Sequence, residues 1–97
     1  MLQVYRYRFA PGVDLQEAED TLLLAMLAAE GLLGEARVRM DAAYTVDESI
    51  RAIVVDASTV VGQIISTIFT TLVLREFGRQ AVDVRKFEGL TRKEGGR

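Results

Sequence analysis

Four arginines at alternate positions have the spacing that most directly suggests chemistry. They occur as two pairs, Arg6 and Arg8 in "YRYRF" and Arg37 and Arg39 in "RVRM". If both segments are strands, alternation places each pair on one face of a sheet. Guanidinium groups so placed can bind phosphate or carboxylate through paired hydrogen bonds. The four arginines are therefore a candidate anion site, with a solvated, ion-paired sheet face as the alternative.

The same segment also suggests nucleic-acid binding, because Arg6 and Arg8 alternate with Tyr5 and Tyr7. RNA-recognition sheets stack bases on aromatic side chains of their central strands. Here the tyrosines and arginines point to opposite faces, and the segment "IRAIVVD" has no aromatic residue. The net charge of −2 gives no general attraction to phosphate. These features disfavour a nucleic-acid partner.

The composition also argues against catalysis. The chain has no histidine and no cysteine, which removes the usual proton-transfer group near neutral pH, the commonest metal ligand and a thiol nucleophile. The acidic pairs Glu19-Asp20 and Asp47-Glu48 are adjacent in sequence, and adjacent side chains diverge on a helix. No glycine-rich phosphate loop occurs. We expect no enzyme activity, no cofactor and no metal.

The longest uncharged stretch lies between Asp56 and Arg75. Its apolar residues recur at every fourth position in two parallel ladders, the spacing of a helix face. Asp56 or Ser58 can cap the start, and Gly78 can close the end in a left-handed conformation. The Ser, Thr and Gln residues within it make the stretch too polar to cross a membrane unassisted. We therefore expect a helix of a folded domain and no membrane partner.

An earlier helix is expected from an N-cap at Asp14 to Gly31 or Gly34. One apolar stripe suits packing against a core: Leu15, Ala18, Leu22, Ala25, Met26, Ala29 and Leu33. Three further leucines lie outside that stripe: Leu23, Leu24 and Leu27.

A period of two predicts strands at residues 2–9, 37–46, 50–56 and 81–88. The order βαββαβ most often gives a ferredoxin-like α+β sandwich, a four-stranded antiparallel sheet with two helices on one face. We expect one such domain over residues 1–88, followed by a frayed charged tail over 89–97. No export signal is visible, so a cytoplasmic setting is expected.

Both helices carry more apolar surface than a sheet can cover. On the later helix the apolar arc spans roughly 220°, about twice the stripe that a surface helix needs. Charge depletion is typical of the centre of a protein interface. The sequence therefore predicts a homo-oligomer that packs through its helical face. The expected contact residues are Leu23, Leu24, Leu27, Val60, Ile64, Thr67, Ile68 and Thr71.

Three alternatives stay open. Helix tilt or a folded-back loop could cover the surplus apolar residues internally. A face rich in Val, Ile, Thr and Leu is also what deliberate interface design leaves, so an engineered variant of a natural domain fits the same pattern. A small-molecule-sensing domain, with ligand enclosed between subunits, is the third.

The chain lacks the motifs of three ferredoxin-like families. It has neither the C-x-x-C of the metal-binding domains nor the histidine of the nucleoside diphosphate kinases. The loop after its first predicted strand lacks the arginine of the acylphosphatases.

Overall fold

A computed structural model describes residues 2–89 of the chain. Its elements follow in the order β1 (Leu2–Phe9), α1 (Leu15–Leu33), α2 (Glu35–Asp41), β2 (Tyr44–Asp47), β3 (Ala52–Asp56), α3 (Val60–Phe77) and β4 (Val82–Gly89). Short 3₁₀ turns, η1 (Glu48–Ile50) and η2 (Arg79–Ala81), precede β3 and β4. Of the expected tail, Gly89 ends β4 and residues 90–97 lie outside the described part.

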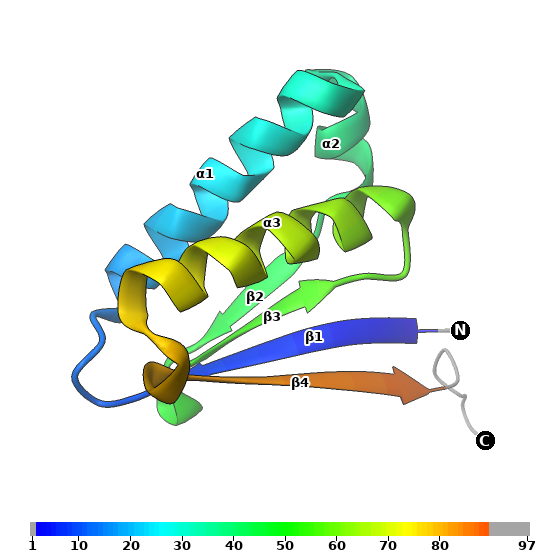
Figure 1. Cartoon of the computed structure of the whole chain (residues 1–97). Coiled ribbons are helices and arrows are strands. Elements are labelled where there is room, and N and C mark those ends of the chain that lie inside the picture. The colour runs from blue at the N-terminus through cyan, green and yellow to red at the C-terminus, as the bar shows by residue number, and fades with distance from the viewer. Residues whose placement is uncertain (1, 90–97) are drawn as a thin grey trace.

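The four strands form one antiparallel sheet in the order β2-β3-β1-β4. Helices α1 and α3 lie together on one face of this sheet, and α2 stands between the end of α1 and the start of α3 (Figure 1). The predicted α+β class with a four-stranded antiparallel sheet is confirmed. The arrangement is compatible with a ferredoxin-like sandwich, from which it differs by its third helix.

Helix α1 follows its sequence signals closely. The Asp14 carboxylate accepts a hydrogen bond from the Gln16 backbone N–H at 2.9 Å, which satisfies one of the free donors at a helix start. Gly34 ends the helix with a φ of 92°, a conformation that glycine adopts without steric cost. Of the expected stripe, Ala18, Leu22, Ala25 and Ala29 are buried, and the other members pack against the core.

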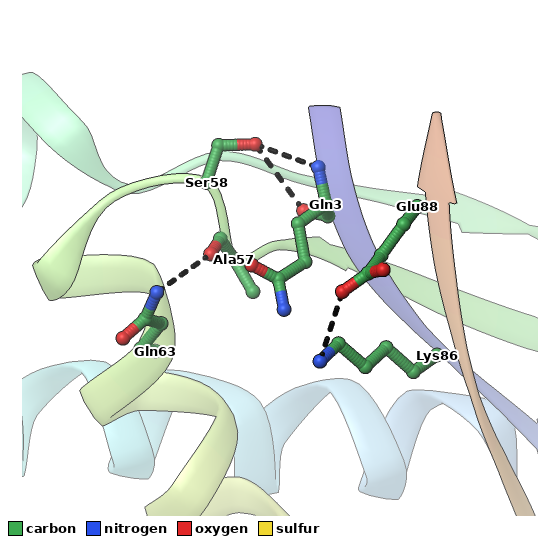
Figure 2. A network of polar contacts seen from close by, with 6 residues as sticks. All are labelled: Gln3, Ala57, Ser58, Gln63, Lys86 and Glu88. Atoms are coloured by element: carbon green, nitrogen blue, oxygen red, sulfur yellow. Dashed lines mark hydrogen bonds and ion pairs between the residues drawn. The ribbon is translucent and has the colours of Figure 1, made fainter. Parts of the chain in front are cut away.

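The N-cap of helix α3 is neither of the two expected residues, Asp56 and Ser58, but Thr59, the residue after Ser58. The Thr59 hydroxyl accepts from the Gly62 backbone N–H at 3.0 Å and makes the N-cap. Asp56 instead accepts from the Ser58 backbone N–H at 2.8 Å. The Ser58 hydroxyl contacts the backbone of Gln3 on β1, accepting at 2.9 Å and donating at 3.3 Å (Figure 2). The predicted closure at Gly78 is confirmed.

The strand predicted over residues 37–46 is wrong in its first half. Residues Glu35–Asp41 form helix α2, and the strand is confined to Tyr44–Asp47. Glu, Ala, Arg and Met favour helices intrinsically, and Glu35 pairs with Arg39 one helical turn away at 2.9 Å. Val38 is the buried residue of this short helix. Alternating polarity over so few residues does not distinguish a strand from a helix with one buried side chain.

The core lies between the sheet and the helices. Tyr7 and Phe9 of β1 are buried there, and the Tyr7 ring packs edge-on against Phe69 of α3 with centroids 4.6 Å apart. Because successive side chains of a strand alternate, Arg6 and Arg8 lie on the opposite, open face of the sheet. The predicted split of tyrosines and arginines between the two faces is confirmed by the burial of β1.

Gly62 sets how closely α3 approaches the sheet. A Cβ atom added there would lie 1.9 Å from the Asp56 carbonyl oxygen, a distance that forces the backbone apart. Only glycine lets the first turn of α3 pass directly over the end of β3.

Candidate functional site

The outward surface of α1 is rich in leucine. Leu23, Leu24 and Leu27 are 46%, 59% and 62% exposed. Helical geometry places them away from the buried Ala18–Ala29 stripe, so they cover no part of the sheet. Residues 21–29 contain no charged side chain that could solvate this surface. The structure therefore leaves the three predicted contact residues of α1 uncovered.

The outward surface of α3 continues this uncharged region. Val60 is exposed, as are Thr67 and Thr71, whereas Ile64 and Ile68 are half-buried and pack partly against the core. All eight predicted contact residues thus lie on α1 and α3, which pack against each other on one face of the sheet (Figure 1).

The threonines of α3 present less polarity than their sequence suggests. The Thr67 hydroxyl donates to the Gln63 carbonyl at 2.9 Å, and the Thr71 hydroxyl donates to the Thr67 carbonyl at 3.2 Å. A hydroxyl bonded back to its own helix leaves its methyl group as the more prominent outward atom. The exposed side of α3 is therefore neutral and partly apolar.

Two exposed apolar side chains were not expected from the sequence. Leu32 near the end of α1 is 73% exposed, and Met40 on α2 is 82% exposed. Met40 belongs to the segment 37–46 that was predicted to be a strand. Leu32 follows the buried Ala25 by two helical turns, so it lies on the inward side of α1 and not beside Leu23, Leu24 and Leu27.

A groove lies between α3 and the strands beneath it. It encloses about 360 Å³ and is lined by Tyr5, Ser66, Thr67, Thr70, Thr71 and Val84. Its lining is uncharged and dominated by hydroxyl groups, which can donate and accept hydrogen bonds. The sequence pattern did not indicate this groove, because its residues come from three separate elements.

A buried hydroxyl pair lies next to this groove. The Tyr7 and Thr70 hydroxyls are 2.8 Å apart, and the Tyr7 hydroxyl also donates to the Ser66 carbonyl at 3.2 Å. Burial raises the pKa of Tyr7 above its usual value of 10.0, since the ionised phenolate would lose its hydration. Tyr7 therefore stays neutral at physiological pH and acts as a structural hydrogen-bonding group.

The four arginines proposed as one anion site do not come together on the sheet. Arg6 and Arg8 lie on β1, but Arg37 and Arg39 lie on α2, which is not part of the sheet. The Arg6 guanidinium stacks over the Phe87 ring, 4.9 Å from its centroid. The expectation of a shared sheet face fails because the segment carrying Arg37 and Arg39 is helical.

Arg51 makes contacts that its sequence context did not suggest. It adopts a left-handed conformation with a φ of 53°, and its guanidinium donates to the carbonyls of Ala10 and Val13. It thereby ties the loop before α1 to the start of β3. This arginine has a structural role and is not free to bind a ligand.

Within residues 2–89, no group of three or more acidic side chains is arranged to hold a metal ion. Helix α3 has the length and apolar composition of a membrane span, with 33% of that stretch buried in this fold. Its buried side packs on the sheet, as in the core helix of a globular domain.

The chain matches none of the protein-family models, curated proteins or solved structures with which it was compared. Its function is therefore inferred from its own residues.

Proposed function

We propose that this chain is a non-enzymatic, cytoplasmic module that associates with copies of itself through the outward surface of α1 and α3, on a ferredoxin-like framework. The observation that carries the proposal is the exposure of Leu23, Leu24 and Leu27 beside the part of α3 before Arg75, which carries no charge. Solvated helix faces normally carry charged residues. Charge depletion with exposed apolar side chains is characteristic of interface centres and uncommon on monomers.

The energetics indicate that both helices take part. Covering three half-exposed leucines contributes about 3 kcal/mol, at roughly 1 kcal/mol for each half-buried side chain. Association costs about 4–15 kcal/mol in lost translational and rotational freedom. The leucines of α1 alone are therefore insufficient, and the neutral surface of α3, with Val60, Ile64 and Ile68, must be covered in the same contact.

The test compares matched surface substitutions on the two faces of the molecule. Leu24→Glu with Leu27→Lys replaces two exposed leucines while leaving the net charge unchanged. Arg8→Glu with Thr45→Lys changes two exposed residues of the sheet. We expect sedimentation to show the same multimer for the wild type and the sheet variant, and a folded species of lower mass for the helix variant. Equal masses for the two variants would contradict the proposal.

A second candidate function is small-molecule binding in the hydroxyl-lined groove between α3 and β4. The specific observation in its favour is the convergence of Tyr5, Thr67, Thr70 and Thr71 around about 360 Å³ without a charged lining residue. A neutral polar ligand would fit this chemistry. A thermal-shift screen with sugars, nucleosides and amino acids tests it, and Thr71→Val should abolish any shift found.

A further inference from the structure

Strand β4 ends the sheet with a long and regular free edge. It pairs residue by residue with β1, from Val82 opposite Phe9 to Gly89 opposite Leu2, without a bulge. No strand lies beyond it among residues 2–89. One row of its backbone N–H and C=O groups therefore faces outward, and such a row can pair with another strand.

The charges along β4 are arranged as two short ion pairs within the strand itself. Asp83 and Arg85 lie 3.3 Å apart, and Lys86 and Glu88 lie 3.0 Å apart. Figure 2 shows the second pair on the side of the sheet where Gln3 and Gln63 lie. Asp83 and Arg85 flank Val84, and Lys86 and Glu88 flank Phe87. When either three-residue segment pairs antiparallel with its own copy, its acidic residue can therefore lie opposite the basic residue of the other copy. Opposite charges directly across two strands stabilise their pairing, and like charges oppose it.

Two copies of β4 that pair antiparallel are related by a two-fold axis. If the helices of both copies are to lie on the same side of the joined sheet, one residue of β4 must lie opposite its own copy, at the axis. Centring it on Arg85 or Lys86 places like charges together. Centring it on Val84 places Asp83 opposite the Arg85 of the other copy, twice. Centring it on Phe87 pairs Lys86 with Glu88 instead. Charge complementarity thus leaves two candidate registers.

The position of α3 favours the register centred on Val84. Val84 lines the groove beneath the middle of α3, together with Thr67, Thr70 and Thr71. An axis at Val84 brings this uncharged flank of α3 against its own copy and closes the groove. An axis at Phe87 leaves the middle of that flank exposed.

We propose that β4 pairs antiparallel with β4 of a second copy of this chain about an axis at Val84, which joins two sheets into one of eight strands. This contact uses none of the α1 leucines and does not depend on them, although Thr67 and Thr71 of α3 lie at its margin. With both contacts, each copy has two neighbours, so assembly proceeds beyond a dimer.

Cysteine cross-linking tests the register directly, because the chain contains no cysteine of its own. Directly opposite residues of an antiparallel pair have Cβ atoms about 4.5–5.5 Å apart, close to the separation that a disulfide spans. Val84→Cys should therefore form a covalent dimer on mild oxidation. Lys86→Cys lies on the same face, but its two copies would be roughly 13 Å apart and should stay unlinked.

The experiment is run in chains that also carry Leu24→Glu and Leu27→Lys, so that contact through the helices does not contribute. Circular dichroism first establishes that each variant is folded. Adding Arg85→Asp to Val84→Cys should slow cross-linking about fivefold by opposing like charges. Adding Asp83→Arg as well should restore it, and Lys86→Glu, a matched change of charge, should have little effect.

Two results would overturn the proposal. One is a folded Val84→Cys chain that remains monomeric under oxidation. The other is rapid linking of Phe87→Cys while Val84→Cys stays unlinked, which would establish the other register. Neither result bears on whether Leu24 and Leu27 form a contact, since that is measured separately.

Discussion

The two outer surfaces of the molecule differ sharply in charge. The outward surface of α1 and α3 carries leucines and threonines, with no charged residue in 21–29 or 57–74. The open face of the sheet carries Arg6, Arg8 and the exposed Asp83–Arg85 ion pair. Charged side chains keep a surface hydrated, and their absence favours contact with another protein. In the proposed account, this difference means that the open face of the sheet faces water and the helices face a partner.

The largest effect is expected from a substitution that displaces α3 from the sheet and so disrupts the helical surface in this comparison. Gly62→Ala forces a Cβ atom against the Asp56 carbonyl, where a contact of 1.9 Å would result. We expect a loss of about 3 kcal/mol in the free energy of unfolding, the upper range for overpacked sites. Urea denaturation measures it.

Gly31→Ala is the control for that substitution, because a Cβ atom at Gly31 of α1 meets no atom within 4 Å. It should leave stability unchanged or raise it by about 0.5–1 kcal/mol, since alanine is the better helix former. Equal destabilisation by the two substitutions would show that close approach at Gly62 is not the cause.

A smaller effect is expected where α3 meets β1 inside the core. Tyr7→Phe removes the hydroxyl that pairs with Thr70 at 2.8 Å and should cost about 1 kcal/mol of unfolding free energy. Thermal unfolding measures this change. An unaltered midpoint would show that the hydroxyl pair contributes no net stability.

The same hydroxyl gives a pH dependence with a defined sign. Because the pKa of Tyr7 is raised in the fold, the unfolded chain ionises first as the pH rises. Stability should be complete below about pH 10 and should fall as the pH rises above it. Tyr44, whose pKa is raised chiefly by its hydrogen bond to Glu19, adds to this fall. Tyr7→Phe should make the decline shallower, and an identical alkaline profile would contradict this assignment.

The smallest effect is expected on the open face of the sheet. Arg85→Gln breaks an ion pair whose side chains are 64% and 55% exposed. Exposed pairs contribute roughly 0–1 kcal/mol, so the unfolding midpoint in urea should move little. A large loss would mean that this face depends on its charges for folding, and the contrast with the helical face would weaken.

The elements with long periodic patterns could be predicted from the sequence. The i, i+4 ladders gave α3 and its closure at Gly78, and the stripe through Leu22 and Ala25 gave the buried side of α1. The surplus leucines followed from the same periodicity. They remain exposed because each helix has only one side that can face the sheet.

Short segments and long-range contacts could not be predicted in this way. Glu35–Asp41 alternates over too few residues to reveal a helix whose only buried side chain is Val38. The need for glycine at position 62 depends on where β3 ends beneath it, and the groove at Val84 depends on three elements meeting. Such features are set by tertiary contacts that no local pattern encodes.

The most direct test of self-association is the sedimentation equilibrium of the wild-type chain over a range of concentrations. If the outward surface of α1 and α3 is an interface, the measured mass should be a multiple of 10.7 kDa and should fall on dilution. A mass of a single chain at millimolar concentration would contradict this account. Leu23, Leu24 and Leu27 would then be solvent-exposed leucines without a partner.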